Sequence, residues 1–156
     1  MGVSLGGYYA PRAAAFEPRI RCCVARGSIL DYGATWRLRF EAQTATVSVP
    51  FHQLPWVMGT DTMEAALDRV QQWDLTGVLD RVTQPFLLLL LLLLHHQGEL
   101  DEQVSLDDAM RMFELVASEN KELRIFAESK GGAEHCRSDE PGAALNFICD
   151  WAAEKL

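Results

Sequence analysis

The first seven residues of the chain place a serine between small neighbours, in a pattern that could hold a nucleophile. Residues 1–7 read MGVSLGG, which contains Gly-x-Ser-x-Gly followed by a further glycine. A serine hydroxyl attacks a carbonyl group when a sharp strand-to-helix turn exposes it beside a general base, and that turn leaves no room for bulky neighbours. Gly2 and Gly6 meet this requirement, so Ser4 is the candidate nucleophile. The alternative interpretation of so short a pattern is a glycine-rich tail.

A nucleophilic serine needs a base and an acid, and candidates for both follow in the order Ser, Asp, His. Asp101 comes in a polar loop after a leucine run, and His135 comes in a loop that begins with two glycines. His135 would remove the proton from Ser4 and later return it to the leaving group. Asp101 would fix the tautomer of His135 and stabilise the imidazolium. The alternative interpretations are that Asp101 is a solvated loop carboxylate and that His135 is an ordinary surface histidine.

The segments between these residues alternate between helical and extended patterns. Periodic apolar residues and capping residues predict helices over residues 6–16, about 33–43, about 62–72, from 105 onward and over 143–156. A short run rich in β-branched residues and cysteine predicts a strand over 20–25, and the uninterrupted leucines predict one over 87–94. Alternation predicts a third strand over 123–128, as a half-buried sheet edge. Residues 75–82 are predicted as a short helix or turn. Functional side chains of such a sheet collect at the carboxyl ends of its strands, where Asp101 and His135 are expected.

The leucine run 87–94 has two interpretations, part of a membrane-spanning helix or a buried strand. It is about half of the ~20 apolar residues that a helix needs to cross a bilayer, and no second apolar stretch extends it. A strand buried on both faces of a parallel sheet explains the run better, although leucine favours helices.

Residues 28–55 have no single period and are interpreted as one helix followed by an irregular segment. The aromatic residues of this part of the chain have two interpretations: they pack the excursion onto the sheet, or some of them line a substrate pocket above Ser4. These residues are Tyr32, Trp36, Phe40, Phe51 and Trp56. His52 is interpreted as structural or exposed.

The length, charge and cysteine content of the chain exclude some classes of function. The chain has 156 residues and 49% hydrophobic composition, which predicts one domain with a real core. A net charge of −8 argues against a nucleic-acid partner or an anionic membrane surface, since both need clustered Lys and Arg. The four cysteines lack zinc-ribbon spacing and follow no signal peptide, which predicts reduced thiols and a cytoplasmic location. His95 and His96 have no third ligand at a supporting spacing, so no metal is expected.

Three segments together carry a family resemblance. Residues 2–10 (GVSLGGYYA), 98–104 (GELDEQV) and 131–136 (GGAEHC) resemble the C-terminal half of an α/β-hydrolase. More narrowly, they are similar to the branch that includes the fungal heptaketide-shortening hydrolase of pigment synthesis and bacterial 2,6-dihydroxypseudooxynicotine hydrolase. The resemblance covers nearly the whole chain. It implies an α/β fold, the C-terminal portion of a three-layer sandwich with about four mostly parallel strands flanked by helices.

The resemblance also implies a chemistry. This chemistry is the hydrolysis of an ester, or of a carbon–carbon bond beside a ketone, in a small-molecule substrate. Polyketide-type compounds of secondary metabolism are one class of such substrates. No cofactor is implied. Ser4, Asp101 and His135 would form the triad, and the backbone N–H of Leu5 would be one oxyanion donor. Residues 1–156 would then be a single truncated domain that lacks the N-terminal strands and the cap region.

A second hypothesis of a different class stays open. In it the chain is a catalytically inactive fragment, or an interaction or structural remnant that needs its missing N-terminal half. Such a chain would pair its exposed sheet edge with a partner or with itself.

Overall fold

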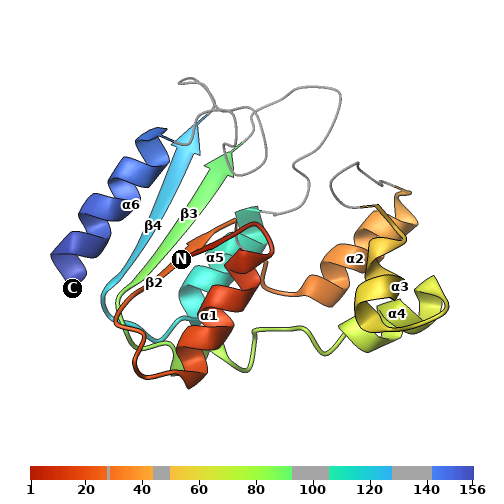
Figure 1. Ribbon diagram of the computed structural model, residues 1–156. Helices are drawn as coiled ribbons and strands as arrows, with labels where there is room; N and C mark the ends of the chain where they lie inside the picture. The colour runs from red at the N-terminus through yellow and green to blue at the C-terminus, as the bar shows by residue number, and fades with distance from the viewer. Residues whose placement is uncertain (28, 44–49, 93–105, 128–141) are drawn as a thin grey trace. The chain divides into compact units, whose positions relative to one another are not determined.

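The computed structural model describes residues 1–27, 29–43, 50–92, 106–127 and 142–156 (Figure 1). These residues form two compact units, Met1–Leu30 together with Leu75–Leu156, and Asp31–Asp74. The sequence-based expectation of a single domain stays a prediction.

The first unit is built on a parallel sheet of four strands in the order β1-β2-β3-β4. The strands are β1 (Gly2–Val3), β2 (Cys23–Arg26), β3 (Phe86–Leu92) and β4 (Lys121–Ala127). The helices are α1 (Gly6–Phe16), the short 3-10 helix η1 (Leu79–Arg81), α5 (Leu106–Leu115) and α6 (Gly142–Lys155). Parallel neighbours joined by helices confirm the predicted α/β class.

The leucine run forms the strand that the sequence predicts. β3 pairs with β2 on one side and with β4 on the other, so it lies inside the sheet. Successive side chains of a strand point to opposite faces, and both Leu87 and Leu88 are fully buried. Burial of both faces therefore explains a continuous apolar run, and it overrides the helical preference of leucine.

Helices cover both faces of this sheet. α6 packs Ile148 and Trp151 against Val24, Leu87 and Leu89. α1 contacts β2 and α5 contacts β3, and Figure 1 shows both helices on the opposite side of the sheet from α6. The sheet thus lies between helical layers, as the predicted sandwich requires.

The apolar pattern of the last predicted helix indicates a buried face made of Leu145, Ile148, Cys149, Trp151 and Ala152. The structure shows that this prediction is partly wrong. Ile148 and Trp151 are buried as predicted, but Leu145 is 37% exposed and Cys149 is also exposed. The residues that face the sheet are Ala144, Ile148 and Trp151, at a spacing of four and then three. Leu145 and Cys149 each come one position later, about 100° further around the helix, and so point away from the sheet.

The second strand begins later than predicted. Residues 20–25 were expected to be extended, but β2 starts at Cys23, where the backbone N–H donates to the carbonyl of Pro85. Before it, the N–H of Ile20 donates to the carbonyl of Glu17 and closes a turn. The turn holds the preceding residues out of the sheet.

The predicted edge strand 123–128 corresponds to β4, which is the last strand in the order of the described sheet.

Lys121 holds the carboxyl end of α5. Its ammonium donates to the carbonyls of Phe113 at 2.8 Å, Glu114 at 3.3 Å and Val116 at 2.7 Å. These carbonyls belong to the last turn, where helical carbonyls lack a partner within the helix and where the helix dipole favours a cation. Lys121 therefore links the start of β4 to the end of α5.

We expect Lys121→Met to lower the free energy of unfolding by about 1–2 kcal/mol, because the charged hydrogen bonds are lost while the aliphatic stem is kept. Urea unfolding followed by circular dichroism measures this change. Arg21→Met removes a positive charge from an exposed residue outside any helix and serves as the control. Equal stabilities of the two variants would contradict the capping role of Lys121.

The second unit has its own apolar core. It contains α2 (Tyr32–Glu41), α3 (Gln53–Met58) and α4 (Met63–Val70). α2 and α4 confirm the helices predicted near these positions. The core consists of Trp36, Leu54, Met58, Ala66, Leu67 and Val70, with Tyr32, Phe40, Phe51, Met63 and Trp73 packed against it.

α3 was not predicted, because its sequence contains a proline and follows another. Pro55 is the third residue of the helix, where the N–H that proline lacks would have no partner within the helix. Gly59 ends the helix in the left-handed conformation with φ of 63°. The expected irregular segment, which extended to residue 55, is therefore wrong over residues 53–55, where α3 begins.

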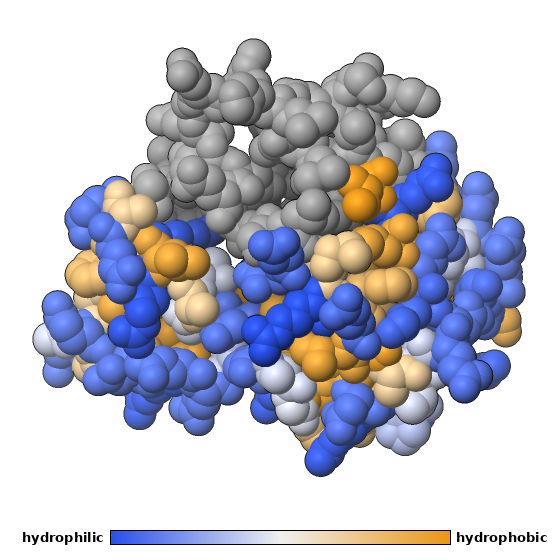
Figure 2. All heavy atoms as spheres, turned by 180° about the vertical axis from the view of Figure 1, so that it is seen from behind, coloured by the Kyte–Doolittle hydropathy of each residue, from blue (hydrophilic) through white to orange (hydrophobic). Residues whose placement is uncertain are grey.

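Hydrophilic side chains dominate the described surface on the face that Figure 2 shows, with apolar side chains in smaller areas between them. Within the described ranges, no helix combines the length and the apolar character that crossing a membrane requires.

Candidate active site

Ser4 lies at the turn between the first strand and the first helix. β1 ends at Val3, α1 begins at Gly6, and the backbone of Ser4 has φ of 56°. This left-handed conformation is uncommon for any residue other than glycine and costs about 1–2 kcal/mol for an L-residue. The turn is the strained strand-to-helix elbow that the sequence predicts, and it lies at the carboxyl end of β1.

Backbone hydrogen bonds fix this conformation. The N–H of Ser4 donates to the carbonyl of Arg26 at 2.9 Å, which ties the elbow to the end of β2. The carbonyl of Ser4 accepts from the N–H of Gly7 at 2.7 Å, and the carbonyl of Leu5 accepts from the N–H of Tyr8 at 3.0 Å. Hydrogen bonds on both sides of the turn therefore fix the strained backbone conformation of Ser4.

Two glycines allow the elbow to pack closely. A Cβ on Gly2 would lie 1.8 Å from the carbonyl oxygen of Gly6, and a Cβ on Gly7 would lie 1.6 Å from the carbonyl oxygen of Gly27. Both distances are far below van der Waals contact, so no larger residue fits either position without backbone movement.

Gly6 differs from these two glycines. A Cβ on Gly6 would meet no atom within 4 Å among the described residues. The sequence pattern predicts that Gly2 and Gly6 are the positions without room for a side chain, and the structure shows that the second such position is Gly7. The sequence shows only that Gly7 follows Gly6, because its steric role depends on Gly27, twenty positions further along the chain.

The helix that follows offers donors beside the serine. Leu5 precedes the first residue of α1 and has right-handed backbone angles, with φ of −55° and ψ of −26°. The first N–H groups of a helix have no acceptor within it, and the positive end of the helix dipole lies there. The backbone around Leu5 is therefore suited to stabilise negative charge that develops next to Ser4.

The other two predicted catalytic residues cannot be placed. Asp101 and His135 both lie outside the described residues, as do His95, His96 and Ser105, the residue at which the next helix is predicted to begin. Their roles stay predictions. Within the described ranges, no group of three or more His, Cys, Asp or Glu side chains could hold a metal ion.

The aromatic residues proposed for a pocket above Ser4 contact one another within the second unit. Tyr32 stacks on Trp73 with ring centroids 5.6 Å apart, and Phe40 meets Phe51 edge-on at 5.9 Å. Trp36 is buried in the same core, whereas Trp56 is 82% exposed. The core of this unit accounts for Tyr32, Trp36, Phe40 and Phe51 without a ligand.

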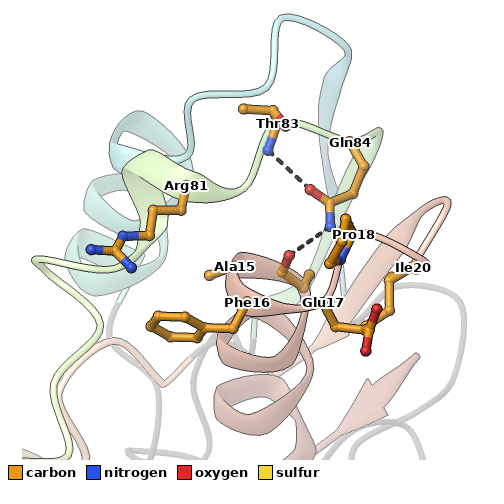
Figure 3. Close-up of a pocket in the computed structure, with 9 residues that line it drawn as sticks. Ala15, Phe16, Glu17, Pro18, Ile20, Arg81, Thr83 and Gln84 are labelled. Atoms are coloured by element: carbon orange, nitrogen blue, oxygen red, sulfur yellow. Dashed lines mark hydrogen bonds between the residues drawn. The ribbon is translucent and has the colours of Figure 1, made fainter.

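A groove of about 300 Å³ in the first unit lies at the wrong end of the sheet for catalysis (Figure 3). It is lined by the end of α1 and by Thr83 and Gln84, which precede β3. Since α1 runs back from the elbow, these residues lie at the amino ends of the strands, opposite Ser4.

The side chains of Gln84 and Glu17 in this groove have hydrogen-bond partners. Gln84 donates to the carbonyl of Ala14 and accepts from the N–H of Thr83, and Figure 3 shows both bonds. Glu17 accepts from Arg19, and these hydrogen bonds lower the pKa of the Glu17 carboxyl. Gln84 and Glu17 therefore serve to hold the end of α1.

The described cysteines differ in reactivity. Cys22, Cys23 and Cys149 are free thiols. Burial raises the pKa of Cys23 to about 12, so at neutral pH it stays a protonated thiol. Cys23 is therefore not a competing nucleophile in the sheet beside Ser4.

The chain matches solved structures of hydrolases. It resembles 2,6-dihydroxy-pseudo-oxynicotine hydrolase at 26% identity with a TM-score of 0.74, over 99% of this chain and 39% of that one. It resembles the α/β hydrolase GrgF from a Penicillium species at 17% identity with a TM-score of 0.63, over 99% of this chain and 62% of that one. No family model matches the sequence, and the search of curated proteins gave no match.

An esterase from Pyrococcus furiosus is also similar, at 18% identity with a TM-score of 0.63, over 99% of this chain and 52% of that one. The chain thus spans less than two thirds of the length of each of these structures. The likenesses cover nearly all of the chain, and its parallel sheet, covering helices and elbow agree with them. The fold is therefore that of the C-terminal portion of an α/β hydrolase.

Proposed function

We propose that this chain carries the nucleophile of a serine hydrolase that acts on an ester or on a carbon–carbon bond next to a ketone. The observation that carries the proposal is the positive φ of Ser4 at a β1–α1 turn, with its N–H held by β2. Within the described ranges, Gln43 is the only other non-glycine residue with positive φ, and it follows the end of α2. Such strain is retained where it serves a function.

The proposed reaction uses three side chains of this chain and no cofactor. His135 removes the proton from the hydroxyl of Ser4, and the oxygen attacks the substrate carbonyl. Asp101 orients His135. The N–H of Leu5 stabilises the oxyanion, and His135 then protonates the leaving group. Water hydrolyses the acyl-enzyme in a second cycle of the same steps. The similarity to 2,6-dihydroxy-pseudo-oxynicotine hydrolase supports a small-molecule substrate, and polyketide-type ketones belong to that class. A cytoplasmic location stays a prediction.

The first test is hydrolysis of 4-nitrophenyl acetate and of a short aryl β-diketone by the purified chain, with Ser4→Ala as the blank. A rate above this blank for either substrate supports the proposal and identifies the bond class. A folded wild-type chain whose rates equal those of Ser4→Ala would refute it.

A second candidate function is association through the edge of the sheet. Within the described residues β1 pairs with β2 alone, so its other side has no neighbouring strand, and Val3 is 40% exposed. Unpaired strand edges present backbone donors and acceptors to other chains.

We expect this edge to produce self-association that depends on concentration, which sedimentation velocity between about 1 and 100 μM would detect. Val3→Pro removes the backbone donor of an exposed edge residue and should favour the monomer. A wild-type chain that stays monomeric over the whole range would remove this candidate.

A further inference from the structure

The groove at the amino ends of the strands is preformed, because its two sides are joined to each other (Figure 3). The end of α1 and the turn after it line one side, and the segment from η1 to β3 lines the other. The side chain of Gln84 donates to the carbonyl of Ala14 at 2.9 Å and ties the two sides together. Leu79 and Val82 are fully buried and anchor the backbone on either side of Arg81. A ligand would therefore not have to order the backbone of this groove on binding.

Two guanidinium groups lie over the ring of Phe16, which lines the groove. The Cζ of Arg81, itself a lining residue, is 5.1 Å from the ring centroid, and the Cζ of Arg12 is 5.7 Å from it. Within the described part of the chain, neither side chain makes a hydrogen bond or an ion pair. A guanidinium over a ring keeps the N–H donors of its own plane for other acceptors. Two cations beside one ring, in a chain of net charge −8, make this a local positive region that favours an anion.

The carboxylate that lines the groove does not take the place of such an anion. Glu17 accepts from the guanidinium of Arg19 at 2.8 and 2.7 Å. These hydrogen bonds lower the pKa of the Glu17 carboxyl, so at neutral pH it is ionised and paired with Arg19. The guanidinium of Arg81 therefore stays available to a ligand.

Apolar side chains line the same groove beside Arg81. They belong to the end of α1 and to the turn after it, and they include Phe16, Pro18 and Ile20. Figure 3 shows Arg81 and Phe16 at the left of the groove and Pro18 and Ile20 at its right. A cation at one end and apolar side chains toward the other fit a ligand that is anionic at one end and apolar at the other.

We propose that this groove is a second binding site, separate from Ser4, that takes a small organic acid with an apolar tail. The carboxylate binds the guanidinium of Arg81, whose planar fork of donors matches two carboxylate oxygens, and the tail lies toward Pro18 and Ile20. The groove volume of about 300 Å³ is at the lower end of the roughly 300–1,000 Å³ of ligand sites, which favours a tail of a few carbons. Since the groove and Ser4 lie at opposite ends of the strands, binding here does not depend on the proposed reaction.

NMR titration of the ¹⁵N-labelled chain with hexanoate and with hexanamide tests this inference. The two molecules have the same tail and nearly the same shape, and only hexanoate is charged. We expect hexanoate to bind at least about 10-fold more tightly, because charge-assisted hydrogen bonds are stronger than neutral ones. The largest shifts should occur at backbone amides of residues 14–20 and 81–84. Acetate, which has the charge without the tail, should bind at least about 10-fold more weakly than hexanoate.

Variants of Arg81 identify the group that binds the carboxylate. In Arg81→Gln the affinities for hexanoate and hexanamide should become equal, and Arg81→Lys should keep a reduced preference, because lysine retains the charge without the fork. Arg124→Gln is the matched control. Arg124 is also exposed and lies with its Cζ 5.1 Å from a phenylalanine ring, that of Phe147, but it does not line the groove. Its replacement should leave both affinities unchanged.

Equal affinities of the wild-type chain for hexanoate and hexanamide would overturn the inference, whether or not any variant folds. Shifts confined to residues outside the groove would overturn it as well. A preference for hexanoate that survives in folded Arg81→Gln would also overturn it, because another group would then bind the carboxylate.

Discussion

Ser4→Ala is expected to lower kcat for ester hydrolysis on the order of 10⁴-fold or more, because the attacking oxygen is removed. The loss should occur without unfolding, since alanine adopts the same backbone angles at similar cost. Steady-state kinetics with 4-nitrophenyl acetate measures the effect. Ser118→Ala is the matched control, because Ser118 is a buried serine whose hydroxyl has no hydrogen-bond partner among the described residues. A comparable loss in both variants would contradict a specific role of Ser4.

A companion variant separates backbone strain from chemistry. Ser4→Gly also lacks the hydroxyl, but glycine adopts φ of 56° without a steric penalty. We therefore expect Ser4→Gly to be about 1 kcal/mol more stable than Ser4→Ala while equally inactive. Urea unfolding of the two variants measures the difference. Equal stabilities would show that the elbow is unstrained in solution, which would remove the main structural support for a nucleophile at this turn.

Gly7→Ala is expected to destabilise the fold by about 3 kcal/mol or more, because its methyl group would overlap a backbone oxygen that cannot move without breaking the sheet. The added carbon would lie 1.6 Å from the carbonyl oxygen of Gly27, and the N–H of Gly27 is bound to the carbonyl of Leu89 at 3.1 Å. Thermal and urea unfolding measure the loss. A domain stable by about 5–15 kcal/mol would lose a large share of that margin.

The adjacent glycine provides the control. Gly6→Ala adds the same methyl group one position earlier, where no described atom lies within 4 Å, at the first residue of α1. Its stability should be unchanged or raised by up to about 1 kcal/mol, since alanine is the better helix former. If both variants lost the same stability, the contact between α1 and the end of β2 would not be the cause.

The sequence predicts those elements of both units whose signals are local. The run Leu87–Leu92 is too short for a membrane span and too apolar for an exposed element, so burial inside a sheet follows from its composition. Capping residues and apolar periodicity place α4, where Thr62 accepts the N–H of Ala65. Such features depend on neighbours within a few residues, which the sequence displays directly.

The parts that the sequence does not predict depend on distant contacts. The steric role of Gly7 requires Gly27, and the exclusion of residues 20–22 from β2 requires Pro85 as the partner of Cys23. α3 was missed because proline inside a short segment suggests a break, although the first turn of a helix accepts it. Arg26, which is 8% exposed at the end of β2, is also buried without any local signal in the sequence. The predicted roles of Asp101 and His135 concern residues beyond those described.

The most direct test of the central claim is the site at which a fluorophosphonate reacts. The purified, folded chain is incubated with the probe, digested, and analysed by tandem mass spectrometry, beside Ser4→Ala and His135→Ala. We predict one phosphonylated residue, Ser4, with no labelling in Ser4→Ala and strongly slowed labelling in His135→Ala. A folded wild-type chain that stays unlabelled, or that carries the adduct on another residue, would contradict the account.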